Sequence, residues 1–283
     1  YIIDIKYIKL FMKYNCISDR IVLYYRRFQN RYTERSIAMR IIFTDTYKKM
    51  SEEAAKIIAG QLWIKPDSVL GLATGSTPVE LYQNLVWLYK TVGLDFSQAT
   101  SFNLDEYVGL PEDDPQSYHR FMHENLFDHV NIRKDHVFFP NGLAADSAAE
   151  GERYEDAITA AGGIDMQLLG IGRNAHIGFN EPADAFTRIT HKVALKESTI
   201  EANARFFASR DEVPREAMSM GIGTIFRARH IVLLASGAEK AEAVRDAVQG
   251  AITPAVPASI LQLHPSVTLI VDDEAGALIK TKA

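Results

Sequence analysis

The sequence contains a single cysteine, Cys16, among its 283 residues. One cysteine cannot form an intramolecular disulfide or a cysteine-based zinc cluster, and this usage is typical of a reducing compartment such as the cytoplasm. Long hydrophobic runs are also missing, since runs such as IVLLA at 231–235 are far shorter than the roughly 20 residues of a membrane-spanning helix. An excess of positive charge is lacking as well, because the net charge is −5. We therefore expect neither a membrane nor a nucleic-acid partner.

The charge is unevenly distributed along the chain. Residues 1–38 carry eight Lys or Arg and three Asp or Glu, whereas residues 39–283 carry a net charge of −10. We predict that 39–283 form the functional domain and that 1–38 are an N-terminal extension. A tail without function is favoured over a targeting segment or a basic interaction arm. The extension has no apolar stretch ending in a small-residue cleavage site, and it is rich in bulky aromatic residues.

From Met39 onward, short β-branched runs alternate with helical patterns. Strands separated by helices of 10–15 residues predict crossover connections and a buried parallel sheet. The sequence therefore predicts one α/β domain with a three-layer, doubly wound (Rossmann-like) fold and a mainly parallel central sheet. Gly250 is predicted to end the last helix in a left-handed cap. The expected strands are 40–44, 69–73, 100–104, 166–170, 230–235 and 267–271, and the expected helices are 47–59, 78–90, 117–127 and 238–249.

Ligands of such sheets bind beyond the carboxyl ends of the strands, so the loops that follow the strands are informative. The loop after the second strand has the capping-box spacing of Thr77 and Glu80, with Pro78 at the expected first helical position. Free N–H groups, hydroxyls and the helix dipole would suit an anion such as a phosphate, while a simple well-capped turn is the alternative. The loop matches neither a Walker P-loop nor a GxGxxG fingerprint. Its residues are Thr74, Gly75, Ser76 and Thr77.

The loop after the third strand is acidic. Asp105 and Glu106 come directly at the end of that strand. A carboxylate in a cleft can act as a general base if its surroundings adjust its pKa. The alternative is that Asp105 serves as a cap or turn residue.

The fourth loop, GIGRNAHIGFNEP, places Asn174, His176, Asn180 and Glu181 within eight positions. A carboxylate can orient an imidazole and stabilise its charged form, so His176 and Glu181 are a candidate proton-transfer pair. A core histidine that never meets the loop acid is the alternative. No metal site is expected, because one histidine with scattered acids lacks HExxH-type spacing.

Taken together, these segments resemble the glucosamine-6-phosphate deaminase family, also called the glucosamine-6-phosphate isomerase family. The resemblance covers essentially all of 39–283, and residues 1–38 have no counterpart in it. Any one matching block could arise by chance, but six blocks in family order are specific. They are MRIIFTD, GLATGSTP, FNLDEYVGL with QSYHRFMHENLFDHV, GIGRNAHIGFNEP, ANARFF and ILQLHP.

The resemblance implies that the chain converts glucosamine 6-phosphate and water to fructose 6-phosphate and ammonia without a cofactor or metal. It implies that Asp105 moves a proton from C2 to C1 of the substrate. It also implies that His176 opens the sugar ring with Glu181 as its carboxylate partner. Arg205 and Lys240 match the cations that bind the substrate phosphate together with the loop after the second strand. A Schiff-base role for Lys240 is the less favoured alternative.

Two residues depart from the common family pattern. Asn174 stands where some members have an aspartate, and we keep it as a site residue. Because an amide carries no negative charge, we expect His176 to rely more on Glu181. Ala175 replaces a usual glycine, which would strain the loop if that position requires a positive φ.

Two other functions are compatible with the same architecture. A 6-phosphogluconolactonase-like enzyme would not need a C2 base, so Asp105 argues against it. A non-catalytic sugar-phosphate-binding regulator would need only the phosphate site, so the presence of Asp105, His176 and Glu181 together argues against that. The expected partner is a small sugar phosphate, and the resemblance leaves the assembly open between a monomer and a homo-oligomer.

Overall fold

Parallel strands form the central sheet of the protein, whose computed structural model describes residues 39–279. The predicted extension at 1–38 therefore lies outside the described residues. All neighbouring strands of this sheet pair in parallel. The strand order is β1 (Arg40–Thr44), β10 (Val267–Asp272), β9 (His230–Ala235), β6 (Met166–Gly170), β2 (Val69–Leu72), β3 (Thr100–Asn103) and β5 (Val137–Phe138).

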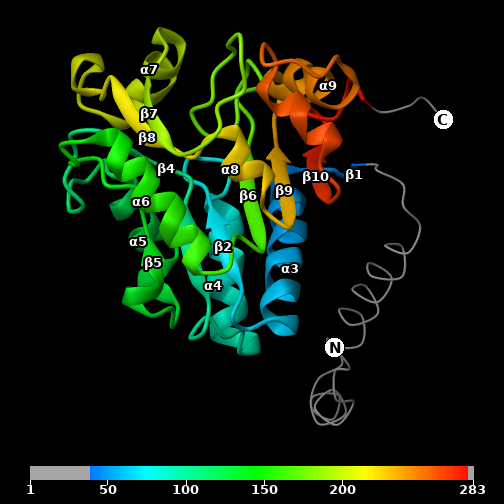
Figure 1. Cartoon of the computed structure of the whole chain (residues 1–283). Coiled ribbons are helices and arrows are strands. Elements are labelled where there is room, and N and C mark those ends of the chain that lie inside the picture. Colours follow the sequence, from blue (N-terminus) through cyan, green and yellow to red (C-terminus); the bar gives the residue numbers. More distant parts are fainter. Residues whose placement is uncertain (1–38, 280–283) are drawn as a thin grey trace. The chain divides into compact units, whose positions relative to one another are not determined.

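Helices cover both faces of the sheet, which confirms the predicted three-layer fold (Figure 1). Side chains alternate between the faces along each strand. In β9, Val232 and Leu234 pack in one core, and Ile231 and Leu233 pack in the other. The first core contains side chains of α3 (Tyr47–Ile64), α4 (Val79–Val92) and α5 (Tyr118–Asn125), and the second contains side chains of α6 (Ser147–Ala160), α8 (Ile222–Phe226) and α9 (Ala241–Gln249).

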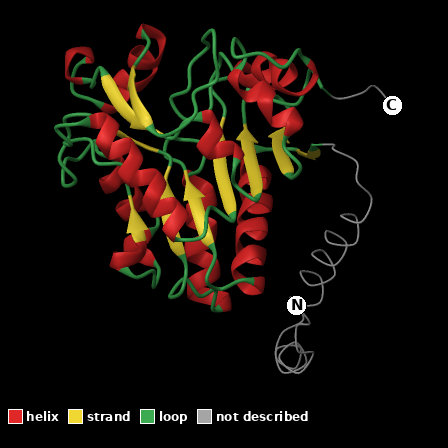
Figure 2. Cartoon of the chain, viewed as in Figure 1, coloured by secondary structure: helices red, strands yellow, loops and turns green. Residues whose placement is uncertain are grey.

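A small antiparallel sheet accompanies the central one. Its order is β4 (Asp105–Tyr107), β8 (Glu216–Ser219) and β7 (His191–Ala194), and α7 (Glu197–Asn203) follows β7. Figure 2 shows the arrows of the central sheet pointing toward the end of the molecule where α7 lies. The sequence analysis missed this sheet because strands of three or four residues are too short for a clear hydrophobic period.

The predicted elements agree with the observed ones to within a few residues at most ends, with two exceptions at the last helix. The segment predicted as one helix over 238–249 begins with a 3₁₀ turn, η5 (Ala238–Lys240), before α9. The predicted left-handed cap at Gly250 is wrong, because its φ is −77°. A β-carbon at Gly250 would lie 2.5 Å from the carbonyl oxygen of Asp246, so close packing against the helix end explains the glycine.

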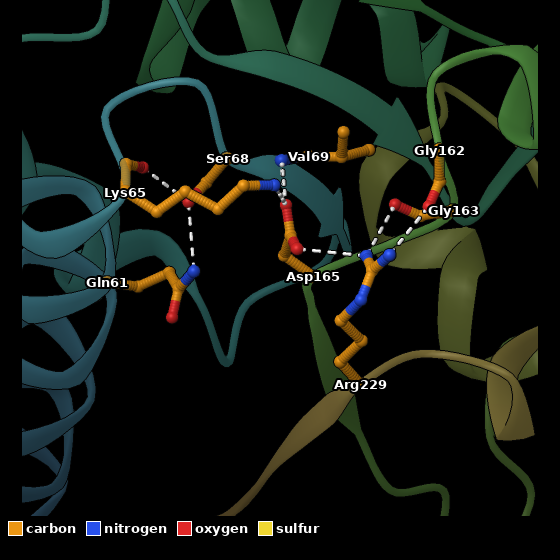
Figure 3. A network of polar contacts seen from close by, with 8 residues as sticks. All are labelled: Gln61, Lys65, Ser68, Val69, Gly162, Gly163, Asp165 and Arg229. Atoms are coloured by element: carbon orange, nitrogen blue, oxygen red, sulfur yellow. Dashed lines mark hydrogen bonds and ion pairs between the residues drawn. The ribbon is translucent and has the colours of Figure 1, made fainter. Parts of the chain in front are cut away.

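The amino ends of β2 and β6 are fastened by a polar network (Figure 3). Asp165, which is 6% exposed, accepts hydrogen bonds from the backbone N–H of Val69 at 2.8 Å and from Nζ of Lys65 at 2.5 Å. It also accepts one from Nη1 of Arg229 at 2.9 Å. These contacts join the end of α3 to two neighbouring strands and to the segment that enters β9.

Candidate active site

A cavity of about 1060 Å³ opens beyond the carboxyl ends of β2 and β6. These strands are neighbours, but the chain continues from β2 toward β3 and β5 and from β6 toward β9 and β10. Such a switch point is where open α/β sheets bind their ligands. Glu181 touches two of the predicted site residues that line the cavity. The predicted residues that line it are Thr74, Gly75, Ser76, Thr77, Asp105, Asn174, His176, Arg205 and Lys240.

The loop between β2 and α4 turns at Gly75, whose φ is +105°. This backbone conformation favours glycine, which has no β-carbon to clash. The next residue, Ser76, accepts a hydrogen bond at its Oγ from Nη2 of Arg205 at 3.3 Å. The fold therefore brings Arg205 to the loop that the sequence predicts to hold a phosphate.

Helix α4 begins without a side-chain cap, so the predicted capping box of Thr77 and Glu80 is wrong. Pro78 occupies the cap position instead. The Tyr47 hydroxyl accepts a hydrogen bond from the backbone N–H of Glu80 at 3.2 Å and donates one to the carbonyl of Ser76 at 3.0 Å. Tyr47 thus ties the loop to the start of α4. With the N–H of Glu80 bound by Tyr47, the positive dipole and the other N–H groups of the first turn suit an anion in the cavity.

The turn that carries Lys240 is anchored by Asp272 at the end of β10. The Asp272 carboxylate accepts hydrogen bonds from Oγ of Ser236 at 2.5 Å and from the backbone N–H of Gly237 at 3.1 Å. Gly237 has a φ of +92°, which favours glycine. This arrangement fixes the loop after β9 at the edge of the cavity.

Positive charge gathers around Lys240. Burial lowers the pKa of the Lys240 ammonium group, and the nearby charges of Arg173 and Arg205 lower it further, while Glu239 acts in the opposite direction. All three cations line the cavity. Mutual repulsion of this kind is relieved when an anion binds among the cations.

Asp105 is the first residue of β4 and is only 5% exposed. Burial raises the pKa of its carboxyl to about 8, and the charge of Glu106 adds to this. A base with a pKa near neutrality is well suited to accept a proton from a substrate carbon. The carboxyl borders the cavity, as the strand-end position of Asp105 predicts.

Glu106 has a different role from its neighbour, because successive side chains of a strand point to opposite faces. Its carboxylate accepts hydrogen bonds from the backbone N–H groups of Tyr107, Tyr118 and His119 at 2.8, 2.9 and 2.8 Å. Two of these N–H groups belong to the first turn of α5. Glu106 therefore stabilises the start of a helix, where negative charge is favourable.

His176, Asn174 and Glu181 form one hydrogen-bonded cluster. Nδ1 of His176 lies 2.7 Å from Oδ1 of Asn174 and 3.4 Å from Oε1 of Glu181. Nδ2 of Asn174 donates to Oε2 of Glu181 at 2.6 Å. The amide oxygen of Asn174 is thus the nearer partner of His176, the amide links the imidazole to Glu181, and Glu181 supplies the negative charge of the cluster.

Glu181 is held in its charged form. Burial alone would raise its pKa, but the hydrogen bond and charge of His176, with hydrogen bonds from Thr199 and Asn174, lower it to about 2. An ionised carboxylate beside an imidazole stabilises the protonated ring. The cluster therefore places an ionised carboxylate beside the imidazole of His176.

The backbone around His176 leaves little choice of residue. A β-carbon at Gly172 would lie 2.2 Å from Cε1 of His176, so only glycine leaves room for the ring there. Ala175 has a φ of +62°, so the condition under which an alanine would strain this loop is met. Strain of about 1–2 kcal/mol is typical of a non-glycine residue in this conformation.

The sequence analysis missed several polar residues of the cavity. Arg173 lies within the GIGRNAHIGFNEP segment, so its charge beside Asn174 could have been noticed. Helix α7 ends two residues before Arg205, so the role predicted for Arg205 could have drawn attention to the polar residues of that helix. Tyr47 gives no signal, since it begins a helix far from the loops of interest. The missed residues are Tyr47, Arg173, Thr199, Glu201, Asn203 and Glu239.

Among the described residues, 39–279, no three His, Cys, Asp or Glu side chains come together in a way that could bind a metal ion. None of the helices there has both the length and the apolar character needed to cross a membrane.

Comparisons with known proteins agree on one family. The profile of a family described as glucosamine-6-phosphate isomerases/6-phosphogluconolactonase matches residues 44–270. A glucosamine-6-phosphate deaminase of Thermoanaerobacter pseudethanolicus is 54% identical over 241 residues, which are 85% of this chain and 95% of that protein. A glucosamine-6-phosphate deaminase of Clostridioides difficile is 57% identical over 244 residues, covering 86% of this chain and 98% of that protein.

Solved structures separate close relatives from distant ones. A structure described as a monomeric glucosamine-6-phosphate deaminase is 49% identical, covers 85% of this chain and all of its own, and has a TM-score of 0.83. A 6-phosphogluconolactonase from Trypanosoma cruzi has a TM-score of 0.70 over 87% of this chain and 98% of its own. Its identity of 20% shows a shared fold and no more.

Proposed function

The chain belongs to the family of glucosamine-6-phosphate isomerases and 6-phosphogluconolactonases, and from this premise we propose that it deaminates glucosamine 6-phosphate. The products are fructose 6-phosphate and ammonia. One observation carries the proposal: a buried carboxyl, a histidine–carboxylate cluster and three cations border the same cavity. These groups supply a carbon base, a ring-opening acid and a phosphate site.

The phosphate end of the substrate lies against the loop Thr74–Thr77. Arg205 already contacts this loop, and Lys240 approaches from the turn after β9. An arginine fork, an ammonium group and the N–H groups at the start of α4 together provide charge-assisted hydrogen bonds to a dianion. Binding the phosphate in this way positions the sugar for reaction at its other end.

Ring opening takes place at His176. The imidazole exchanges a proton with the ring oxygen of the sugar, while Asn174 and Glu181 orient the ring and stabilise its charged form. Opening gives an aldehyde at C1, which makes the C2 proton acidic. C2 of the open chain is then accessible to the base, Asp105, in the same cavity.

Proton transfer takes place at Asp105. Its carboxylate removes the proton from C2 and returns it to C1, while the C1 carbonyl oxygen takes a proton from the substrate's ammonium group, so that C1 becomes an alcohol carbon and C2 a protonated imine. Water adds to the imine, and ammonia leaves to give the ketone. The positive amino group of the bound substrate favours the charged form of Asp105, because an opposite charge nearby lowers a carboxyl pKa.

The assay that tests this function supplies glucosamine 6-phosphate and measures ammonia and fructose 6-phosphate together. Release of both in equal amounts is the expected result. Hydrolysis of 6-phosphogluconolactone without ammonia release would favour the lactonase alternative. Binding of the sugar phosphate without turnover would favour a non-catalytic regulator.

We assign this reaction to residues 39–283 and expect residues 1–38 to be dispensable. Protein that begins at Met39 should fold and release ammonia at the rate of the full chain. Loss of most activity would show that the extension contributes to the domain. A homo-oligomer stays a prediction that light scattering can test, and the single cysteine and the phosphorylated substrate fit a cytoplasmic reaction.

A further inference from the structure

The segment from α7 to the following 3₁₀ turn, η3 (Ala204–Phe206), contributes residues to the cavity and forms hydrogen bonds with three other parts of the chain. Thr199 donates a hydrogen bond from Oγ1 to Oε1 of Glu181 at 2.6 Å. Asn203 donates from Nδ2 to the hydroxyl of Tyr107 at 2.9 Å. Arg205 donates to Ser76 in the phosphate-binding loop. We call this segment, 197–206, the bridging segment.

Thr199 completes the set of hydrogen bonds around the Glu181 carboxylate. Asn174 binds Oε2, and Thr199 binds Oε1, which is also the oxygen that faces Nδ1 of His176. The Glu181 side chain is only 7% exposed, so water has little access to replace a lost donor. Without the Thr199 hydroxyl, the carboxylate oxygen beside His176 would lose the hydrogen bond that fixes its position.

We propose that Thr199 is a positioning residue for ring opening, which fixes Glu181 so that Glu181 and Asn174 together hold His176 in its reactive orientation. This inference rests on the proposed deaminase function. Thr199 does not itself touch the reacting atoms. Its effect reaches the substrate through the carboxylate and the imidazole.

The bridging segment also links this contact to the phosphate. Arg205 lies six positions after Thr199 and reaches the loop where the phosphate binds. A phosphate bound between Arg205 and that loop holds the segment in the position from which Thr199 reaches Glu181. Binding energy at the far end of the substrate is thereby used to order the ring-opening residues.

The first test replaces Thr199 by valine, which keeps the shape and removes the hydroxyl. Because a hydrogen bond to a charged group is lost, kcat for glucosamine 6-phosphate should fall roughly 10-fold, with KM changed less than about 3-fold. Thr199→Ser, which restores the hydroxyl, should recover most of kcat. Thr199→Ala removes the same hydroxyl and replaces the valine variant if that variant does not fold.

Thr190→Val is the matched control. Thr190 donates from Oγ1 to Oε1 of Glu155 at 2.7 Å, and neither residue lines the cavity. Its loss should lower thermal stability and leave kcat unchanged. Equal kcat values in Thr199→Val and wild-type enzyme would overturn the proposal, as would equal losses in the valine and serine variants.

A double-mutant cycle tests the link to the phosphate. If Arg205 acts partly through Thr199, the combined Thr199→Val and Arg205→Ala variant should lose less kcat than the product of the single losses. Losses that simply multiply would overturn the link. Failure of the deaminase function is distinguishable, because wild-type enzyme would then release no ammonia.

Discussion

Two buried aspartates at opposite ends of the central sheet have opposite surroundings. Asp165, at the amino ends of β2 and β6, contacts two cations and a backbone N–H (Figure 3). Asp105, just beyond the carboxyl end of β3, has another carboxylate, Glu106, as its charged neighbour, and its pKa is raised to about 8. The two side chains are equally buried, at 6% and 5% exposed.

This difference separates the structural end of the sheet from the reactive end. A buried carboxylate that is matched by cations stabilises the folded chain, and removing it leaves charges uncompensated. A buried carboxylate without such partners destabilises the fold but is ready to take a proton. Burial alone therefore does not mark a candidate catalytic residue, whereas burial without a compensating partner beside a cavity does.

Replacing Asp105 by asparagine should have the largest effect on activity. The variant keeps shape and hydrogen bonding but loses the basic oxygen, so turnover should fall about 10²–10⁴-fold while substrate still binds. In deuterated water it should incorporate almost no deuterium at C1 or C2. His176→Gln should instead exchange slowly, through the small open-chain fraction of the substrate. Near-normal exchange in the Asp105 variant would exclude it as the base.

Stability should respond in the opposite sense at the two aspartates. Asp165→Asn should lower the free energy of unfolding by about 2 kcal/mol, which is less than the roughly 3–5 kcal/mol of a fully buried ion pair because Lys65 and Arg229 also reach solvent. Activity per folded molecule should be unchanged. Asp105→Asn should instead raise the free energy of unfolding at neutral pH, since the wild-type carboxyl holds its proton in the folded chain but ionises favourably once the chain unfolds. Denaturant titration of wild type and both variants measures these changes in the free energy of unfolding.

The stabilisation expected for Asp105→Asn should depend on pH, and the sign of this dependence follows from the raised pKa. The pKa of Asp105 is higher in the folded chain than the usual value near 4, so the folded state binds this proton more tightly. Its contribution to stability is complete below about pH 4 and is lost as pH rises to about 8. The advantage of Asp105→Asn over wild type should therefore grow across this range, by at most about 1.4 kcal/mol per pH unit. A constant difference would show that the Asp105 pKa is not raised.

The phosphate-binding cations should give the next largest effect. Arg205→Ala and Lys240→Ala each remove a charge-assisted contact worth about 1.5–3 kcal/mol, so KM should rise roughly 10–100-fold. Some loss of kcat is expected for Arg205, because it belongs to the bridging segment. Steady-state kinetics with glucosamine 6-phosphate measure both constants. Unchanged kinetics in both variants would place the phosphate elsewhere in the cavity.

The sequence predicts six strands of the central sheet, because runs such as VLGL in β2 and HIVLLA in β9 are largely apolar, as expected for a parallel sheet that is buried on both faces. Strand β5 has only two residues, Val137–Phe138, and β4 reads DEY, which resembles an acidic loop. Neither has enough length for a hydrophobic period. Their presence depends on the partner strands that the tertiary fold provides.

The sequence predicts which loops meet at the candidate site, because the carboxyl ends of parallel strands lie at one edge of the sheet. It does not predict the exact hydrogen-bond partners within the site. Asn174 and Glu181 are both near His176 in the sequence, and spacing cannot tell which oxygen lies at 2.7 Å and which at 3.4 Å. Tyr47 and Thr199 reach the site from separate elements, so their roles appear only when the chain is folded.

The smallest expected effect is at Ala175, also at the reactive end. Ala175→Gly relieves the strain of a φ of +62°, worth about 1–2 kcal/mol. It also removes a buried methyl group, worth about 0.8 kcal/mol, and adds about 0.5–1 kcal/mol of chain entropy to the unfolded state. These terms nearly cancel, so the free energy of unfolding should change by less than about 1 kcal/mol.

Turnover of Ala175→Gly should also stay close to wild type, because the neighbouring contacts of His176 do not involve the Ala175 side chain. Gly172→Ala is the matched control, since it adds a methyl group three residues earlier in the loop, where it would overlap the His176 ring. That variant should lose most activity. A loss of more than about 2 kcal/mol in Ala175→Gly would mean that packing of the Ala175 methyl group in the core outweighs the backbone strain.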